Sequence, residues 1–142
     1  NSICCSDDYL FVGCYEPGNC VVDLTTNKIV AQNIACHDVI YHKQTLYVTI
    51  TKGRKICIFN NILDRVWPVV PDSYIDLQED AWWRGAIIKD NLMVLFGSSD
   101  YELDKPAKVV IIDLDSKEVV IQRLPTFEGI NWGIVYQPVI YG

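Results

Sequence analysis

Residues 109–119 read VVIIDLDSKEV, and a closely similar stretch, VVDLTTNKI, stands at residues 21–29. Each contains an apolar run, an Asp-Leu pair, a short polar turn with Lys and a second apolar run. Asp side chains accept hydrogen bonds from nearby backbone amides and so stabilise turns, whereas Lys suits a solvent-facing position. We therefore expect Asp23 and Asp113 to form turns at the same corner of two related units. The stretch ICIFNNILDRV, at residues 56–66, is interpreted as a degraded third copy.

The repeat extends over most of the chain. An apolar residue opens the second expected strand of each unit, and these residues are spaced by 36, 46 and 47 positions: Leu10, Leu46, Leu92 and Val139. Short β-branched and aromatic runs alternate with Gly, Pro, Asn and Asp turns, and long helical periodicity is missing. The pattern predicts an all-β chain of four-stranded antiparallel meanders. The expected units lie near residues 1–35, 36–71, 82–125 and 131–142.

Repeats of this kind resemble the blades of β-propellers, in the group that includes WD40, kelch and quinoprotein-like repeats. The sequence lacks the Gly-His and Trp-Asp pairs of WD40 blades, the Gly-Gly pair of kelch repeats and the sialidase Asp-box, so the subfamily stays open. The phrase IIDLDSKEVVIQRLP, at residues 111–125, is also similar to the kelch-like associated domains of plant F-box proteins. The resemblance implies a single repeat domain over residues 1–142 with about three and a half blades. A β-sandwich or a small barrel is the alternative.

Composition narrows the classes of partner. The chain has 142 residues and a formal net charge of -6, which repels a phosphate backbone, so nucleic acid is not an expected partner. No apolar run approaches the roughly 20 residues that span a membrane, so a membrane is not expected either. The glycines are scattered singly and form no phosphate loop, so no cofactor is expected. Because propellers usually close with at least four blades, we expect protein partners or the remaining part of the same propeller to complete the array.

The six cysteines all lie in the first 57 residues: Cys4, Cys5, Cys14, Cys20, Cys36 and Cys57. They contain no C-x-x-C pair, and His37 and His42 fit no common ligand spacing, so no metal site is expected. Free cysteines behave as small buried hydrophobes, and no N-x-S/T sequon is present, which favours the cytoplasm or nucleus. The alternative is a secreted chain with a disulfide between Cys14 and Cys20, which we expect to face each other across a hairpin.

The sequence offers no clear catalytic group. Neither histidine belongs to a nucleophile motif, and Cys36 beside His37 on a strand would point to the opposite face. The acidic clusters within residues 72–80 and 100–104 fall on polar turn segments, where carboxylates are usually solvated. We therefore assign no catalytic residue and leave enzymatic activity open.

The segment DAWWRG, at residues 80–85, contains the candidate binding residues Trp82, Trp83 and Arg84. Trp132 holds a similar place in the next unit. An exposed Trp beside Arg is typical of binding hot spots. The alternative is that these tryptophans are covered and structural. The preferred hypothesis is a non-enzymatic interaction scaffold or substrate-receptor module. A propeller enzyme or carbohydrate-binding module that uses acidic loops or an exposed Trp is the second hypothesis.

Overall fold

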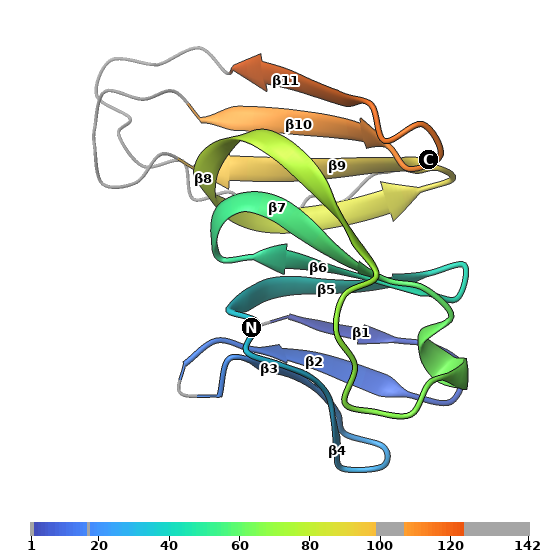
Figure 1. Cartoon of the computed structure of the whole chain (residues 1–142). Coiled ribbons are helices and arrows are strands. Elements are labelled where there is room, and N and C mark those ends of the chain that lie inside the picture. The colour runs from blue at the N-terminus through green and yellow to red at the C-terminus, as the bar shows by residue number, and fades with distance from the viewer. Residues whose placement is uncertain (1, 17, 99–106, 124–142) are drawn as a thin grey trace.

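The computed structural model of the chain describes residues 2–16, 18–98 and 107–123, and Figure 1 shows how they are arranged. Strands dominate this part of the chain, and its one helical element is the short 3-10 helix η1 (Ile62–Asp64). The predicted all-β class is therefore confirmed. The strands are β1 (Ile3–Cys5), β2 (Leu10–Cys14), β3 (Cys20–Asp23), β4 (Lys28–Gln32), β5 (Cys36–His42), β6 (Thr45–Ile50), β7 (Lys52–Phe59), β8 (Ser73–Lys89), β9 (Leu92–Ser98), β10 (Lys108–Asp113) and β11 (Val119–Arg123).

The first four strands form an antiparallel sheet in which chain neighbours pair, in the order β1-β2-β3-β4. We call this sheet the first meander. Side chains alternate between its two faces, so Phe11 and Val21 are fully buried while the adjacent Val12 and Val22 are partly exposed. The alternation leaves one face of the sheet packed and the other face open.

The remaining strands form a seven-stranded antiparallel sheet that follows chain order from β5 to β11. The long strand β8 has two neighbours, because residues 73–76 and 81–82 pair with β7 and residues 82–89 pair with β9. Figure 1 shows β8 arching from one partner to the other. Its register shifts near Gln78 and Gly85, whose φ angles of 66° and 67° are left-handed. We call β5–β7 with residues 73–77 the middle meander, and residues 81–89 with β9–β11 the last meander.

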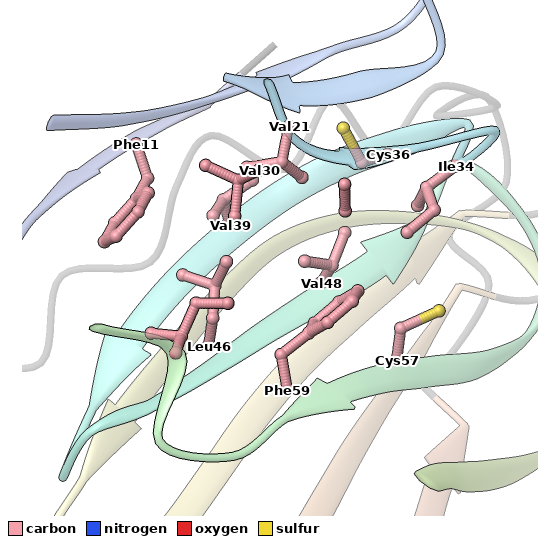
Figure 2. Packing of buried hydrophobic residues seen from close by; sticks show 12 residues of the cluster. Phe11, Val21, Val30, Ile34, Cys36, Val39, Leu46, Val48, Cys57 and Phe59 are labelled. Atoms are coloured by element: carbon pink, nitrogen blue, oxygen red, sulfur yellow. The ribbon is translucent and has the colours of Figure 1, made fainter. Parts of the chain in front are cut away.

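Two apolar clusters hold the three meanders together. The cluster in Figure 2 joins the first and middle meanders, and its members include Phe11, Val21, Val30, Val39, Leu46 and Val48. The second cluster joins the middle and last meanders, and its members include Ile56, Leu77, Trp83, Met93, Leu95 and Ile112. The middle meander is therefore buried on both faces, while the first and last meanders each have one packed face.

The repeat is less regular than the four apolar anchors indicated. Leu46 is fully buried against the first meander, but Leu92 is 48% exposed and the next residue, Met93, is buried against the middle meander. Met93 therefore occupies the position equivalent to Leu46, because a shift of one residue exchanges the two faces of a strand. Val139 and the unit expected at residues 131–142 lie outside the described residues.

Asp23 forms the turn predicted for it. Its carboxylate is fully buried and accepts hydrogen bonds from the backbone N–H groups of Leu10 at 3.0 Å, Thr25 at 3.1 Å and Thr26 at 2.8 Å. The Thr26 hydroxyl also donates to it. These bonds connect the end of β3 both to the following turn and to the start of β2.

The corresponding corners of the other meanders differ in detail. Asp113 accepts hydrogen bonds from the N–H groups of Asp115 and Ser116, both at 2.9 Å, and so also forms the predicted turn. The middle meander has a longer connection that contains η1, and the N–H of Asn60 donates to Asp72 at 2.7 Å. An acidic residue thus bonds the backbone at this corner in all three meanders.

The described strands form open sheets, so within this part of the chain the alternative of a small closed barrel is not observed. Cys14 pairs with Cys20 in the register of β2 and β3, which confirms the predicted hairpin. No helix within residues 2–16, 18–98 and 107–123 is long and apolar enough to cross a membrane.

Candidate functional site

Trp82 lies where three strands of the seven-stranded sheet meet. It pairs with Lys52 of β7 and with Ser98 of β9, and its side chain is half-buried. The Lys52 ammonium lies 5.5 Å from the centre of the Trp82 ring, and the Arg84 guanidinium lies 5.8 Å from it. Both distances permit cation–π attraction, which orders the ring and the two basic side chains together. We call Lys52, Trp82 and Arg84 the tryptophan cluster.

Trp83 points to the opposite face. Its side chain is fully buried in the cluster between the middle and last meanders, and its Nε1–H donates to the carbonyl oxygen of Gly53 at 2.6 Å. This hydrogen bond satisfies the indole nitrogen, as a buried Trp requires. Trp83 therefore has a structural position, and Trp82 and Arg84 are the neighbours that reach the surface. Trp132 lies outside the described residues.

Three of the four acidic residues of the segment 72–80 are held in ion pairs: Asp72, Asp76 and Glu79. Asp76 accepts two hydrogen bonds from Arg54, at 3.0 and 2.8 Å, and Glu79 pairs with Lys108 at 2.6 Å and with Arg123. The hydrogen bond from Arg54 lowers the pKa of Asp76, and the hydrogen bond from Lys108 lowers the pKa of Glu79. Both groups stay ionised at neutral pH and are poor proton donors. The acidic residues at 100–104 lie outside the described residues.

A buried carboxylate that the sequence analysis did not single out lies near a hollow between the first strands of the three meanders. The hollow is lined by residues 2–4, which include the start of β1, by residues 38–40 of β5 and by residues 86–88 of β8. Asp38 is 7% exposed, lies 3.1 Å from Nδ1 of His37, and accepts a 3.3 Å hydrogen bond from the Thr49 hydroxyl. An acidic residue inside the strand Cys36–His42 was the available signal.

Cys36 does not form a catalytic pair with His37. Its thiol is buried and donates to the backbone carbonyl oxygens of Cys20 at 3.3 Å and Cys14 at 3.6 Å. Burial raises the pKa of Cys36 to about 11, so the thiolate needed for nucleophilic attack is scarce at neutral pH. This placement agrees with the expectation that neighbours on a strand face opposite ways.

Cysteines that face each other do not create a metal site. Cys14 and Cys20 are both half-buried. All the cysteines within the described residues are free thiols. Within the described ranges, no group of three or more His, Cys, Asp or Glu residues is arranged to hold a metal ion.

No protein-family model matches the sequence, and no curated protein matches it significantly.

Proposed function

We propose that the chain is an array of β-propeller blades that acts as a non-enzymatic scaffold or substrate-receptor module for other proteins. The observation that carries this proposal is the stacking of meanders in chain order, with the middle one buried on both faces. Blades of a propeller pack on each other in this way, and their first strands gather around a central axis. The hollow lined by residues 2–4, 38–40 and 86–88 places the first strands of all three meanders together.

The tryptophan cluster supports a binding role. A half-buried Trp and an exposed Arg on adjacent surface positions combine a large apolar ring with a forked hydrogen-bond donor. The ring already lies within cation–π distance of two basic side chains, so less side-chain freedom remains to be lost on binding. The free thiols and the sequence composition favour a reducing compartment, the cytoplasm or nucleus, as the place of this interaction.

A paired-variant capture experiment tests the scaffold role. Tagged wild-type chain, Trp82→Ala and Tyr74→Ala are used to capture proteins from a lysate, followed by quantitative mass spectrometry. Tyr74 is the matched control because it also lies on β8, is 49% exposed and has a lysine ammonium, that of Lys55, 4.5 Å from its ring centre. We expect a defined protein to be captured by the wild type and Tyr74→Ala and to be depleted at least about tenfold by Trp82→Ala. Equal capture by all three chains would contradict the proposal.

The same variants test the second hypothesis, that Trp82 stacks on a sugar ring as part of a carbohydrate-binding module or propeller enzyme. The half-buried ring of Trp82 is the observation that favours it. The ion-paired Asp76 and Glu79 argue against hydrolysis, because a glycosidase needs one protonated carboxylic acid. Millimolar binding to one class of glycan, lost in Trp82→Ala, would replace the scaffold proposal with this one.

A further inference from the structure

Cys14 and Cys20 directly face each other at the end of the hairpin formed by β2 and β3. They are register partners, and both are half-buried free thiols. Side chains of directly opposed residues in neighbouring strands point to the same side of the sheet. Burial raises the pKa of Cys20, and the charge of Cys14 and a hydrogen bond with its thiol raise it further. The two sulfur atoms are therefore close enough to interact.

The spacing of the pair suits a disulfide. Directly paired residues of antiparallel strands have Cα atoms about 4.5–5.5 Å apart, and disulfides join Cα atoms about 4.4–6.8 Å apart. A Cβ atom at Gly18 would lie 3.2 Å from Sγ of Cys20 and 3.9 Å from Cβ of Cys14. The missing side chain at Gly18 thus leaves room beside the pair, and the two thiols can join without a change of register.

Cys36 lies against the other side of the same hairpin. Its thiol donates to the carbonyl oxygens of Cys20 at 3.3 Å and of Cys14 at 3.6 Å, and Figure 2 shows its sulfur pointing toward the first meander. A Cβ atom at Gly13 would lie 2.9 Å from Sγ of Cys36. Because neighbours along a strand face opposite ways, the Cys36 thiol is on the side of Gly13 and not on the side of Cys14. Cys36 therefore holds the backbone of both cysteines without facing their thiols.

The other three cysteines, which the structure also describes, lie elsewhere in the fold. Cys5 pairs with Leu10, four residues before Cys14 on β2, which corresponds to about 13 Å along a strand. The remaining two belong to, or pack against, the buried cluster of the first and middle meanders: Cys4 and Cys57. The register thus singles out one pair among the six cysteines.

The end of the hairpin is also tied to the connection between the first and middle meanders. The N–H of Ile34 donates to the carbonyl oxygen of Asn19 at 2.7 Å. Asn19 directly precedes Cys20 and has a left-handed φ of 44°. A crosslink between Cys14 and Cys20 would restrain Asn19 and, through this bond, the backbone at Ile34.

The loop that such a disulfide would close is short. Only residues 15–19 lie between the two cysteines, and a crosslink removes less freedom from the unfolded chain when the loop is shorter. The fold therefore favours this disulfide only modestly, in contrast to structural disulfides, which resist reduction by glutathione. A directly opposed pair with a short loop suits oxidation that can be reversed.

We propose that Cys14 and Cys20 form a reversible redox site, which a small-molecule disulfide such as glutathione disulfide converts into an intramolecular disulfide. One cysteine, as its thiolate, attacks glutathione disulfide, forms a mixed disulfide and releases one glutathione. The second cysteine, as its thiolate, attacks the protein sulfur of the mixed disulfide and releases the second glutathione. The protein loses two electrons, and the two cysteine protons end on the two glutathione thiols. The inference depends neither on the propeller architecture nor on the scaffold role.

Equilibration of the full chain in glutathione buffers of different composition tests the proposal. Remaining thiols are blocked with iodoacetamide in guanidinium, and chymotrypsin then cleaves after Tyr15, between the two cysteines. By mass spectrometry, we expect one disulfide that links the peptides of Cys14 and Cys20. Its yield should rise with glutathione disulfide and fall when reduced glutathione is in excess. The equilibrium constant for its formation should be at least about tenfold larger in the folded chain than in urea.

Hydrogen exchange provides a second readout. Oxidation should slow exchange of the Ile34 amide, because its acceptor on Asn19 becomes more restrained. The Leu114 amide is the matched control, since it donates to the carbonyl oxygen of Asn91 at 2.8 Å in the last meander. Its exchange should be the same in the reduced and oxidised chains.

Serine variants assign the effect to the pair. Cys14→Ser and Cys20→Ser should each abolish both the linked peptide and the change at Ile34, whereas Cys5→Ser and Cys36→Ser should keep the linked peptide. Circular dichroism checks that each variant folds, and alanine replaces serine where it does not. The peptide map of the wild type requires no variant and is decisive by itself.

Four outcomes overturn the inference. Linkage of other cysteines, or a stable glutathione adduct as the final product, shows that the pair does not close. A disulfide that persists in excess reduced glutathione is structural and not reversible. Equal equilibrium constants in the folded chain and in urea show that the fold does not bring the thiols together. None of these outcomes alters the capture result for Trp82→Ala, so failure of the redox site and failure of the scaffold role are distinguishable.

Discussion

The indole ring of Trp83 packs directly on the backbone of Gly97, its register partner on β9. A Cβ atom at Gly97 would lie 2.6 Å from Cζ3 of the ring and 3.1 Å from the Cβ of Ala81. The missing side chain at Gly97 thus makes the space in which Trp83 lies fully buried and reaches the carbonyl oxygen of Gly53. This contact fixes which of the two adjacent tryptophans faces the core.

We expect Gly97→Ala to lower the free energy of unfolding by about 1–3 kcal/mol, because the added methyl overpacks a rigid site. Trp83→Phe removes the ring atoms nearest to that methyl, so the two substitutions together should cost less than the sum of their separate costs. Urea unfolding of the four chains in a double-mutant cycle measures this coupling. Additive costs would show that the ring and the glycine do not constrain each other.

Asp23→Ala should destabilise the chain by about 2–3 kcal/mol, because it leaves partly buried backbone donors, including those of Leu10 and Thr26, without their acceptor. Asp113→Ala is the matched variant at the equivalent corner. Its carboxylate is more exposed and bonds only two amides of its own turn, so water can replace it and the loss should be clearly smaller. Denaturant midpoints compare the two, and equal losses would contradict the assigned role of burial at Asp23.

The stability of the fold should decrease at acidic pH. Burial alone would raise the pKa of Asp23, but hydrogen bonds from the Thr26 hydroxyl and from three backbone amides outweigh burial and lower it. Hydrogen bonds from Ser116 and Asp115 likewise lower the pKa of Asp113. A carboxylate with a lowered folded-state pKa stabilises the fold above its ordinary pKa near 4, and this contribution disappears as the pH falls through the folded-state value.

We therefore expect the urea midpoint to change little between about pH 7 and pH 5 and to fall below about pH 4. Asp23→Asn removes one titrating group, so its midpoint should start lower at neutral pH and decline less steeply with acid. Parallel pH profiles for the wild type and Asp23→Asn would show that Asp23 has the same pKa folded and unfolded.

The buried thiols should resist alkylation in the folded chain. Burial raises the pKa values of Cys36 and Cys57 to about 11, so only about one molecule in a thousand is a thiolate at pH 8. Iodoacetamide followed by peptide mass spectrometry should find both cysteines unmodified in buffer and fully modified in guanidinium. Labelling of either residue in buffer at the denatured rate would place it outside the core.

Sequence by itself determined the features that depend on neighbours along the chain. Short β-branched and aromatic runs separated by frequent turn residues predicted the all-β class, and the Asp-Leu repeats predicted the turns at Asp23 and Asp113. The register of Cys14 with Cys20 could be predicted for the same reason, since a short hairpin fixes the pairing of its own strands.

Tertiary structure decided what depends on contacts distant in sequence. The left-handed residues Gln78 and Gly85 shift the register of β8, so periodicity could not tell which of Trp82 and Trp83 is buried. The pairing of Glu79 with Lys108, and the burial of Asp38 beside Thr49, join segments whose proximity depends on how the meanders fold and stack. Local propensity carries no information about such contacts, because their free energy is gained only when whole sheets pack against each other.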